Sequence, residues 1–195
     1  MKKLYKWSGV QTHWASFENP TGAKGQGGKE NMGAKGHPFD CIRAGEAEKL
    51  LDIKGCGTIT RIWMTVQTDC GREMLRSLRL EMYWDGANKP AVSAPLGDFF
   101  GIALGARVPF ESELFSDPRG RSFNCYIPMP FHYAAKINLI HDSKEDVPNI
   151  YYDVDYLLTD SHDKDTLYFH THWRRENPNR LDRDFYILPE VRGRV

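Results

Sequence analysis

Apolar and polar residues alternate with a period of two through much of this chain, and this pattern limits the folds open to it. In several segments an apolar side chain occupies every second position. Such alternation predicts a strand with one face on a core and the other face outward. The alternating apolar positions are Ile62, Met64 and Val66; Leu78, Leu80, Met82 and Trp84; Ala135, Ile137 and Leu139; and Tyr152, Val154, Tyr156 and Leu158.

Short strands of this kind indicate an all-β fold. The last two of these alternating groups belong to strands predicted around 134–141 and 149–158. Further strands are predicted around 121–127, 166–174 and 184–188, and Asp85-Gly86 supplies a turn signal. Many short strands with turns between them favour a sandwich over a βαβ fold. The length of 195 residues suits one domain. We therefore expect a jelly-roll β-sandwich.

Charge and targeting signals exclude several classes of partner. Lys+Arg and Asp+Glu both count 26, so the net charge of zero gives no long-range attraction to nucleic acid or anionic lipid. The basic start turns polar at once, unlike a signal peptide, and no apolar run is long enough to span a membrane. The cysteines contain no C-x-x-C pair, which predicts buried free thiols in a reducing cytoplasm. They are Cys41, Cys56, Cys70 and Cys125.

A loop rich in glycine and lysine spans residues 20–38. So many glycines predict a loop with unusual backbone angles rather than a helix or strand. A phosphate-binding P-loop would need glycine five residues before Gly28 and a hydroxyl residue after Lys29. Ala23 and Glu30 occupy those two positions, so the nucleotide hypothesis fails.

Two histidines near the C-terminal end could bind a metal. On a strand over 166–174, His170, His172 and Arg174 would share one face. A metal would need a third ligand, for which Glu176 and His141 are the candidates. Such spacing alone is a weak signal, so we favour a polar strand face that lines a groove or meets a neighbouring subunit and predict no metal site.

Asp98 is the carboxylate whose surroundings best suit a sugar. It lies in Pro95-Leu-Gly-Asp-Phe-Phe-Gly101, where the carboxylate could accept sugar hydroxyls while Phe99 stacks on the ring. An Asp that caps its own turn is the alternative. Asp153 and Asp155 share the outward face of their strand, which favours solvated or interface charges over a catalytic pair.

Several segments together resemble one family. In this order they resemble the domain-of-unknown-function 2961 proteins, classed as glycoside hydrolase family 172, from about residue 16 to the end. The segments are Ser16-Phe-Glu-Asn-Pro-Thr-Gly22, Gly57-Thr-Ile-Thr-Arg-Ile-Trp-Met64, Leu80-Glu-Met-Tyr-Trp-Asp-Gly86, Pro95-Leu-Gly-Asp-Phe-Phe-Gly101, Asn124-Cys-Tyr-Ile-Pro-Met-Pro-Phe131 and Tyr168-Phe-His-Thr-His-Trp-Arg-Arg-Glu-Asn-Pro178.

The resemblance implies a double jelly roll that assembles into trimers or larger oligomers. It also implies a retaining mechanism on fructofuranosides or arabinofuranosides, with two glutamates in the second roll and no cofactor. Those glutamates lie in stretches resembling W-G-E-G and G-T-E-D-Y, which do not occur here. We therefore expect an N-terminal arm over 1–40, a first jelly roll over 41–195, no second roll and no catalytic residue on this chain.

Because no catalytic residue is expected on this chain, the resemblance implies that it supports substrate binding. Active sites near protomer boundaries would let the N-terminal loop reach a neighbour's pocket, although a subunit-contact arm is an equal alternative. A non-catalytic module that binds carbohydrate or builds an assembly is the competing function. The predicted substrate-binding residues are Asn19, Lys24 and Lys29 from the loop, with Asp98, Phe99, His170 and Arg174 from the roll.

Overall fold

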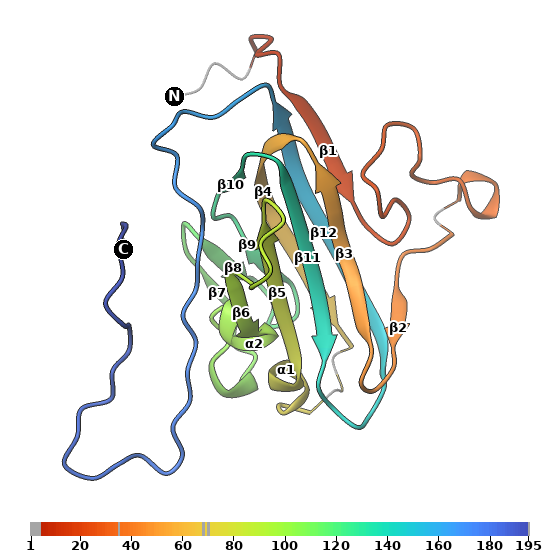
Figure 1. Ribbon diagram of the computed structural model, residues 1–195. Helices are drawn as coiled ribbons and strands as arrows, with labels where there is room; N and C mark the ends of the chain where they lie inside the picture. The colour runs from red at the N-terminus through yellow and green to blue at the C-terminus, as the bar shows by residue number, and fades with distance from the viewer. Residues whose placement is uncertain (1–4, 35, 68, 70, 195) are drawn as a thin grey trace.

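The computed structural model describes residues 5–34, 36–67, 69 and 71–194, and it has two antiparallel sheets packed face to face (Figure 1). The larger sheet has the order β1 (Gln11–Ala15), β12 (Val147–Thr159), β4 (Cys56–Val66), β9 (Phe123–Cys125), β8 (Phe115–Asp117) and β7 (Phe110–Glu111). Outside this order, β10 (Met129–Phe131) pairs with β4, and β2 (Asp40–Ile42) pairs with β12. The smaller sheet has the order β3 (Ala47–Lys54), β11 (Ala134–His141), β5 (Leu78–Trp84) and β6 (Val92–Pro95).

The strand order is that of a jelly roll. Late strands lie between early ones in both sheets: β12 separates β1 from β4, and β11 separates β3 from β5. The connections β3–β4, β4–β5, β10–β11 and β11–β12 therefore cross from one sheet to the other, as Greek keys require. The predicted all-β jelly-roll sandwich is confirmed.

Helical structure is limited to single turns in the described residues. The turns α1 (Met74–Ser77) and α2 (Leu96–Phe99) lie together at one end of the smaller sheet, and two 3₁₀ turns cover Asn31–Gly33 and Ala103–Gly105. None of the helices in the described part of the chain has the length or apolarity to cross a lipid bilayer.

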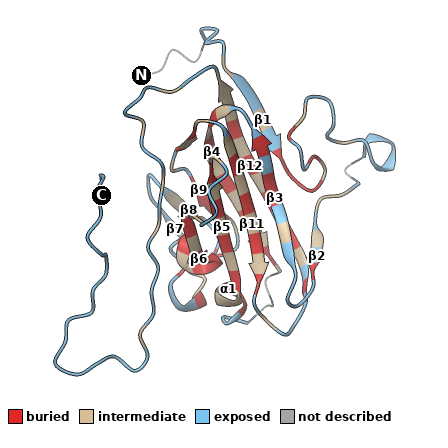
Figure 2. Ribbon diagram, in the orientation of Figure 1, coloured by how far each residue is buried: buried red, intermediate tan, exposed pale blue. Residues whose placement is uncertain are grey.

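The core lies between the two sheets and contains the alternating positions predicted from the sequence (Figure 2). Inward side chains of β4, β5, β11 and β12 are almost wholly buried, because each strand has one face on the opposite sheet. Leu158 is the exception and is half-buried near the end of β12. The buried members include Ile62, Met64, Leu80, Met82, Ile137, Leu139 and Val154.

The cysteines are free thiols wherever the structure describes them. Cys125 is buried, and burial raises the pKa of its thiol to about 12. Cys56 is half-buried, but Cys41 is exposed because it points outward from the short edge strand β2. The prediction of buried thiols is therefore wrong for Cys41, and Cys70 lies outside the described residues.

The strands predicted over 166–174 and 184–188 are wrong. The described residues 160–194 contain no strand and run as an extended segment beside the sandwich (Figure 1). Isolated hydrogen bonds hold the segment near the ends of β5 and β6, among them those from Thr171 N–H to Ala91 O (3.1 Å) and from Trp84 Nε1 to Phe169 O (2.7 Å). Phe169 packs against the core while its neighbours face outward, so an extended segment produces alternation without a strand ladder.

Candidate functional site

The outer face of the larger sheet carries a row of polar and aromatic side chains. Alternation along β4 turns Arg61, Trp63 and Thr65 away from the core. The register with β12 places Asp155 opposite Arg61 and Asp153 opposite Trp63. Because paired positions in an antiparallel sheet project to the same side, these side chains form one continuous surface.

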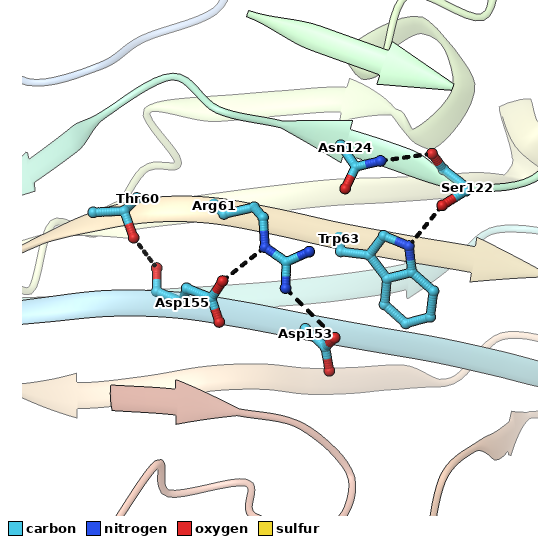
Figure 3. A network of polar contacts seen from close by, with 7 residues as sticks. All are labelled: Thr60, Arg61, Trp63, Ser122, Asn124, Asp153 and Asp155. Carbon is cyan, nitrogen blue, oxygen red and sulfur yellow. Dashed lines mark hydrogen bonds and ion pairs between the residues drawn. The ribbon is translucent and has the colours of Figure 1, made fainter. Parts of the chain in front are cut away.

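Arg61 is shared by two carboxylates on this surface (Figure 3). Its Nε lies 2.7 Å from Asp155 Oδ2, and its Nη2 lies 3.7 Å from Asp153 Oδ2. The register shifts between Asp155 and Tyr156, and the Thr60 hydroxyl there donates to Asp155 O (3.2 Å). Such a bulge re-aims side chains. The expectation that Asp153 and Asp155 share the outward face of their strand is confirmed; their shared ion pair with Arg61 was not predicted.

Replacing Arg61 by glutamine is expected to lower the free energy of unfolding by about 1 kcal/mol, because two neighbouring half-exposed carboxylates lose their shared cation. Urea denaturation at neutral pH measures the change. The matched control is Arg43→Gln, at an exposed position off this surface. Equal stability of the two variants would show that the Arg61 pairs contribute nothing.

Beyond Arg61, the surface opens into a hollow of about 440 Å³, which we call the Trp63 hollow. Trp63 Nε1 donates to Ser122 Oγ (2.9 Å), and the Thr65 hydroxyl donates to Arg121 O (2.6 Å). These bonds fix the turn over 118–122 against β4. The rest of the lining includes Tyr151, Asn149, Gln67 and Arg119.

The Trp63 hollow has the chemistry of a site for a small polar ring. It combines the indole of Trp63 and the phenol of Tyr151 with amide and hydroxyl groups, and Asn149 Nδ2 donates to Gln67 Oε1 (2.9 Å). Its volume falls within the range of about 300–1,000 Å³ typical of small-molecule sites. None of the substrate-binding residues predicted from the sequence lines this site, although an outward tryptophan among polar strand positions was an available signal.

Asp98 and Phe99 lie on the single turn α2 rather than on an open loop. Asp98 Oδ1 accepts from Arg76 Nη2 (3.1 Å), and its Oδ2 accepts from Trp173 Nε1 (2.8 Å). Phe99 is only 6% exposed and packs edge to face against Phe100. Its ring therefore lies in the core, which corrects the expectation of a stacking face for a sugar.

The extended C-terminal segment carries His170, His172 and Arg174, none of which is buried. Trp173 joins this segment to α2 through Asp98, so the structure does bring Asp98 and these residues to one edge of the sandwich. Arg174 lies over the Phe185 ring (4.4 Å) and pairs with Glu176 (3.1 Å).

The structure gives the histidines no shared strand face. His141, one of the two candidate third ligands, is buried at the end of β11 with its Nδ1 3.0 Å from Arg43 O. Within the described ranges, no three His, Cys, Asp or Glu side chains gather in a way that could hold a metal ion.

The glycine-lysine loop lies at the opposite edge, beside β1 and β2 (Figure 1). Asn19 is buried and shapes this loop, since its Nδ2 donates to Ala23 O (3.0 Å) and its Oδ1 accepts from Thr21 (3.3 Å). Lys24 and Lys29 are exposed, with Lys29 Nζ 2.6 Å from Gln26 Oε1. Within one chain, the loop and Asp98 are therefore not brought together. A contact with a neighbouring protomer's pocket stays a prediction.

A family model described as GH172 domain-like matches residues 38–154, more than half of the chain. The chain belongs to this family. The resemblance stated from the sequence is thereby confirmed, and the GH172 domain makes this a glycoside-hydrolase-related protein. Comparison with curated proteins found no match.

The matched span of the GH172 domain runs from just before β2 into β12 and contains the whole Trp63 hollow. It excludes β1 and the extended C-terminal segment. Because β1 pairs with β12 from Gln11 to Ala15, the predicted arm over 1–40 nevertheless contributes a strand to the larger sheet.

Proposed function

We propose that this GH172 domain belongs to a protein that cleaves or transfers fructofuranosyl or arabinofuranosyl units. The proposed mechanism is retaining, with one glutamate as acid/base and another as nucleophile. Both glutamates would come from a second jelly roll, so this chain alone would be inactive. Its own contribution would be carbohydrate binding and assembly with other protomers.

The Trp63 hollow carries the binding part of this proposal. Sugar rings present flat C–H faces that pack on aromatic rings and hydroxyls that need directional partners. Trp63 and Tyr151 supply the rings, while Asn149, Gln67 and Ser122 supply donors and acceptors within one hollow. The same observation favours a second candidate function, a carbohydrate-binding module with no catalytic partner.

The carboxylates support inactivity of the chain alone. A retaining pair needs a protonated acid and a free nucleophile about 5–5.5 Å apart. Asp98 is already bound by Arg76 and Trp173, and Asp153 and Asp155 share Arg61. To act as a nucleophile, any of these carboxylates would first have to lose its hydrogen bonds or ion pair.

Glu48 has surroundings that suit a general acid, but it does not lie at the Trp63 hollow. Burial, together with nearby Asp40, raises the pKa of its carboxyl above the ordinary value. It lies on β3 in the smaller sheet, whereas the Trp63 hollow lies on the larger sheet. Glu48 is therefore the internal control for any activity of the chain alone.

Hydrolysis of p-nitrophenyl α-D-arabinofuranoside and of a fructofuranosyl disaccharide tests the proposal. We expect no turnover by this chain and turnover once a separately expressed second roll of the family is added. Turnover by the chain alone that Glu48→Gln or Asp98→Asn abolishes would refute the proposed inactivity. Sugar binding without turnover, even with the second roll, would establish the binding module instead.

A further inference from the structure

Two arginines lie at the Trp63 hollow without a carboxylate partner in the described part of the chain. Arg119 and Arg121 both come from the turn between β8 and β9, and both are exposed. The residues that line the hollow include no Asp or Glu, and neither guanidinium has an ion pair among the described residues. By contrast, Arg61, Arg76 and Arg79 all pair with carboxylates.

The turn that presents these arginines is built into the fold. Asp117 is fully buried at its start, and its Oδ1 accepts the backbone N–H of Ser122 (2.9 Å). Gly120 has a φ of +68°, a left-handed conformation that favours glycine. The Thr65 hydroxyl anchors the Arg121 carbonyl to β4 (2.6 Å). Both guanidinium groups therefore extend from a turn whose backbone is fixed beside the Trp63 ring.

We propose that the Trp63 hollow binds a saccharide that carries an anionic group, namely a carboxylate, sulfate or phosphate. This inference rests on the carbohydrate binding proposed above and names its ligand class. Trp63 and Tyr151 would pack on the sugar ring, while Arg119 and Arg121 would bind the anion. Guanidinium groups match planar carboxylate and tetrahedral phosphate oxygens through paired hydrogen bonds that the negative charge strengthens, and neutral sugar hydroxyls lack that charge.

The charge around the hollow favours a small anionic saccharide over a nucleic acid. Asp153 and Asp155 lie on the same face next to Trp63, and the whole chain has no net charge. A long polyanion would cross these carboxylates, whereas a ligand of a few rings can end at the arginines. Among the residues that line the hollow, the charged groups are thus the two arginines.

Calorimetric titration of the full chain tests the ligand class. The matched probes are trigalacturonate against its methyl ester, a sulfated disaccharide against the unsulfated one, and methyl arabinofuranoside 5-phosphate against methyl arabinofuranoside. We expect at least one anionic probe to bind at least about ten-fold more tightly than its neutral match. The variant Arg119→Gln/Arg121→Gln should remove that difference, while Arg43→Gln should keep it. Circular dichroism confirms that each variant is folded.

Three outcomes would overturn the inference. Equal affinity for anionic and neutral probes would remove the anion preference but leave carbohydrate binding intact. Inorganic sulfate that binds as tightly as the sulfated disaccharide would show that no saccharide is recognised. Absence of binding by every saccharide would remove the hollow as a sugar site, while the reconstituted hydrolysis assay would still decide the proposed parent activity separately.

Discussion

Asp85→Ala is expected to lower the free energy of unfolding by about 3 kcal/mol. The Asp85 carboxylate accepts the backbone N–H groups of His132 (3.1 Å), Tyr133 (2.6 Å) and Ala134 (2.9 Å), and also the hydroxyl of Tyr168. It therefore ties the end of β5 to the turn before β11 and to the C-terminal segment. Alanine would leave these donors without their acceptor, and the φ of +54° at this position adds strain.

The measurement for Asp85→Ala is urea denaturation at neutral pH, with Tyr168→Phe as the comparison. Tyr168→Phe removes one donor and leaves the backbone hydrogen bonds in place, so its effect should be about 1 kcal/mol. A loss for Asp85→Ala no larger than that for Tyr168→Phe would show that the backbone hydrogen bonds do not stabilise the fold.

Low pH should reduce the stabilisation that the Asp85 carboxylate contributes to the fold. Burial alone would raise the pKa of Asp85, but the hydrogen bonds from Tyr168 and the backbone outweigh burial and hold the pKa below its ordinary value of 3.8. The folded state thus binds this proton less tightly than the unfolded state. The stabilisation is complete above the ordinary pKa and is lost as the pH falls through the folded pKa. Asp85→Asn should lack this acid-dependent loss in denaturation curves measured across that range.

Gly57→Ala should also destabilise the protein by about 3 kcal/mol or more, because a Cβ at this position has no space. It would overlap Leu157 O on β12 and lie 2.7 Å from Phe131 Cζ on β10. Both neighbours belong to strands paired with β4, so neither can move without disturbing a ladder. The expected result is a lower melting temperature and a lower yield of folded protein.

The control for Gly57→Ala is Gly27→Ala. Gly27 lies in the glycine-lysine loop, where an added Cβ would have Asn19 Cβ as its nearest neighbour at 3.8 Å, an ordinary contact. Its substitution should change stability by no more than about 0.5 kcal/mol. A Gly57→Ala variant as stable as Gly27→Ala would mean that β10 and β12 can separate at no measurable cost.

Alternation predicted the sandwich because it reports which face of a strand meets a core, as at Ile62 and Met64. Alternation reports only which side chains face the core, not whether the backbone pairs with another strand, so the strand predicted over 166–174 was wrong. Phe169 does face the core, but the ladder partners that define a strand are long-range and leave no local trace. The glycine-lysine loop was predictable as irregular, since several of its glycines have positive φ, whereas β1 inside the predicted arm was not.

The candidate site was harder to predict than the fold. Phe99 next to Asp98 suggested a face on which a sugar ring could stack, but α2 turns the Phe99 ring into the core. Asp98 instead accepts a hydrogen bond from Trp173, a residue distant in the sequence. The Trp63 hollow depends on a turn over 118–122 that only the pairing of β4 with β9 brings to Trp63. The strand order brings these residues together although they are distant in the sequence, and a single sequence does not specify that order.

The position of β12 has a consequence for how the chain folds. β1 has β12 as its sheet neighbour, with Gln11 opposite Leu158, and β12 also separates β1 from β4. The first strand therefore lacks its ladder partner during synthesis until residues 147–159 have emerged from the ribosome. Pairings between such distant segments must close a long loop before they gain contacts, which slows folding. The apolar inner face of the larger sheet stays incomplete, and open to aggregation, until β12 arrives.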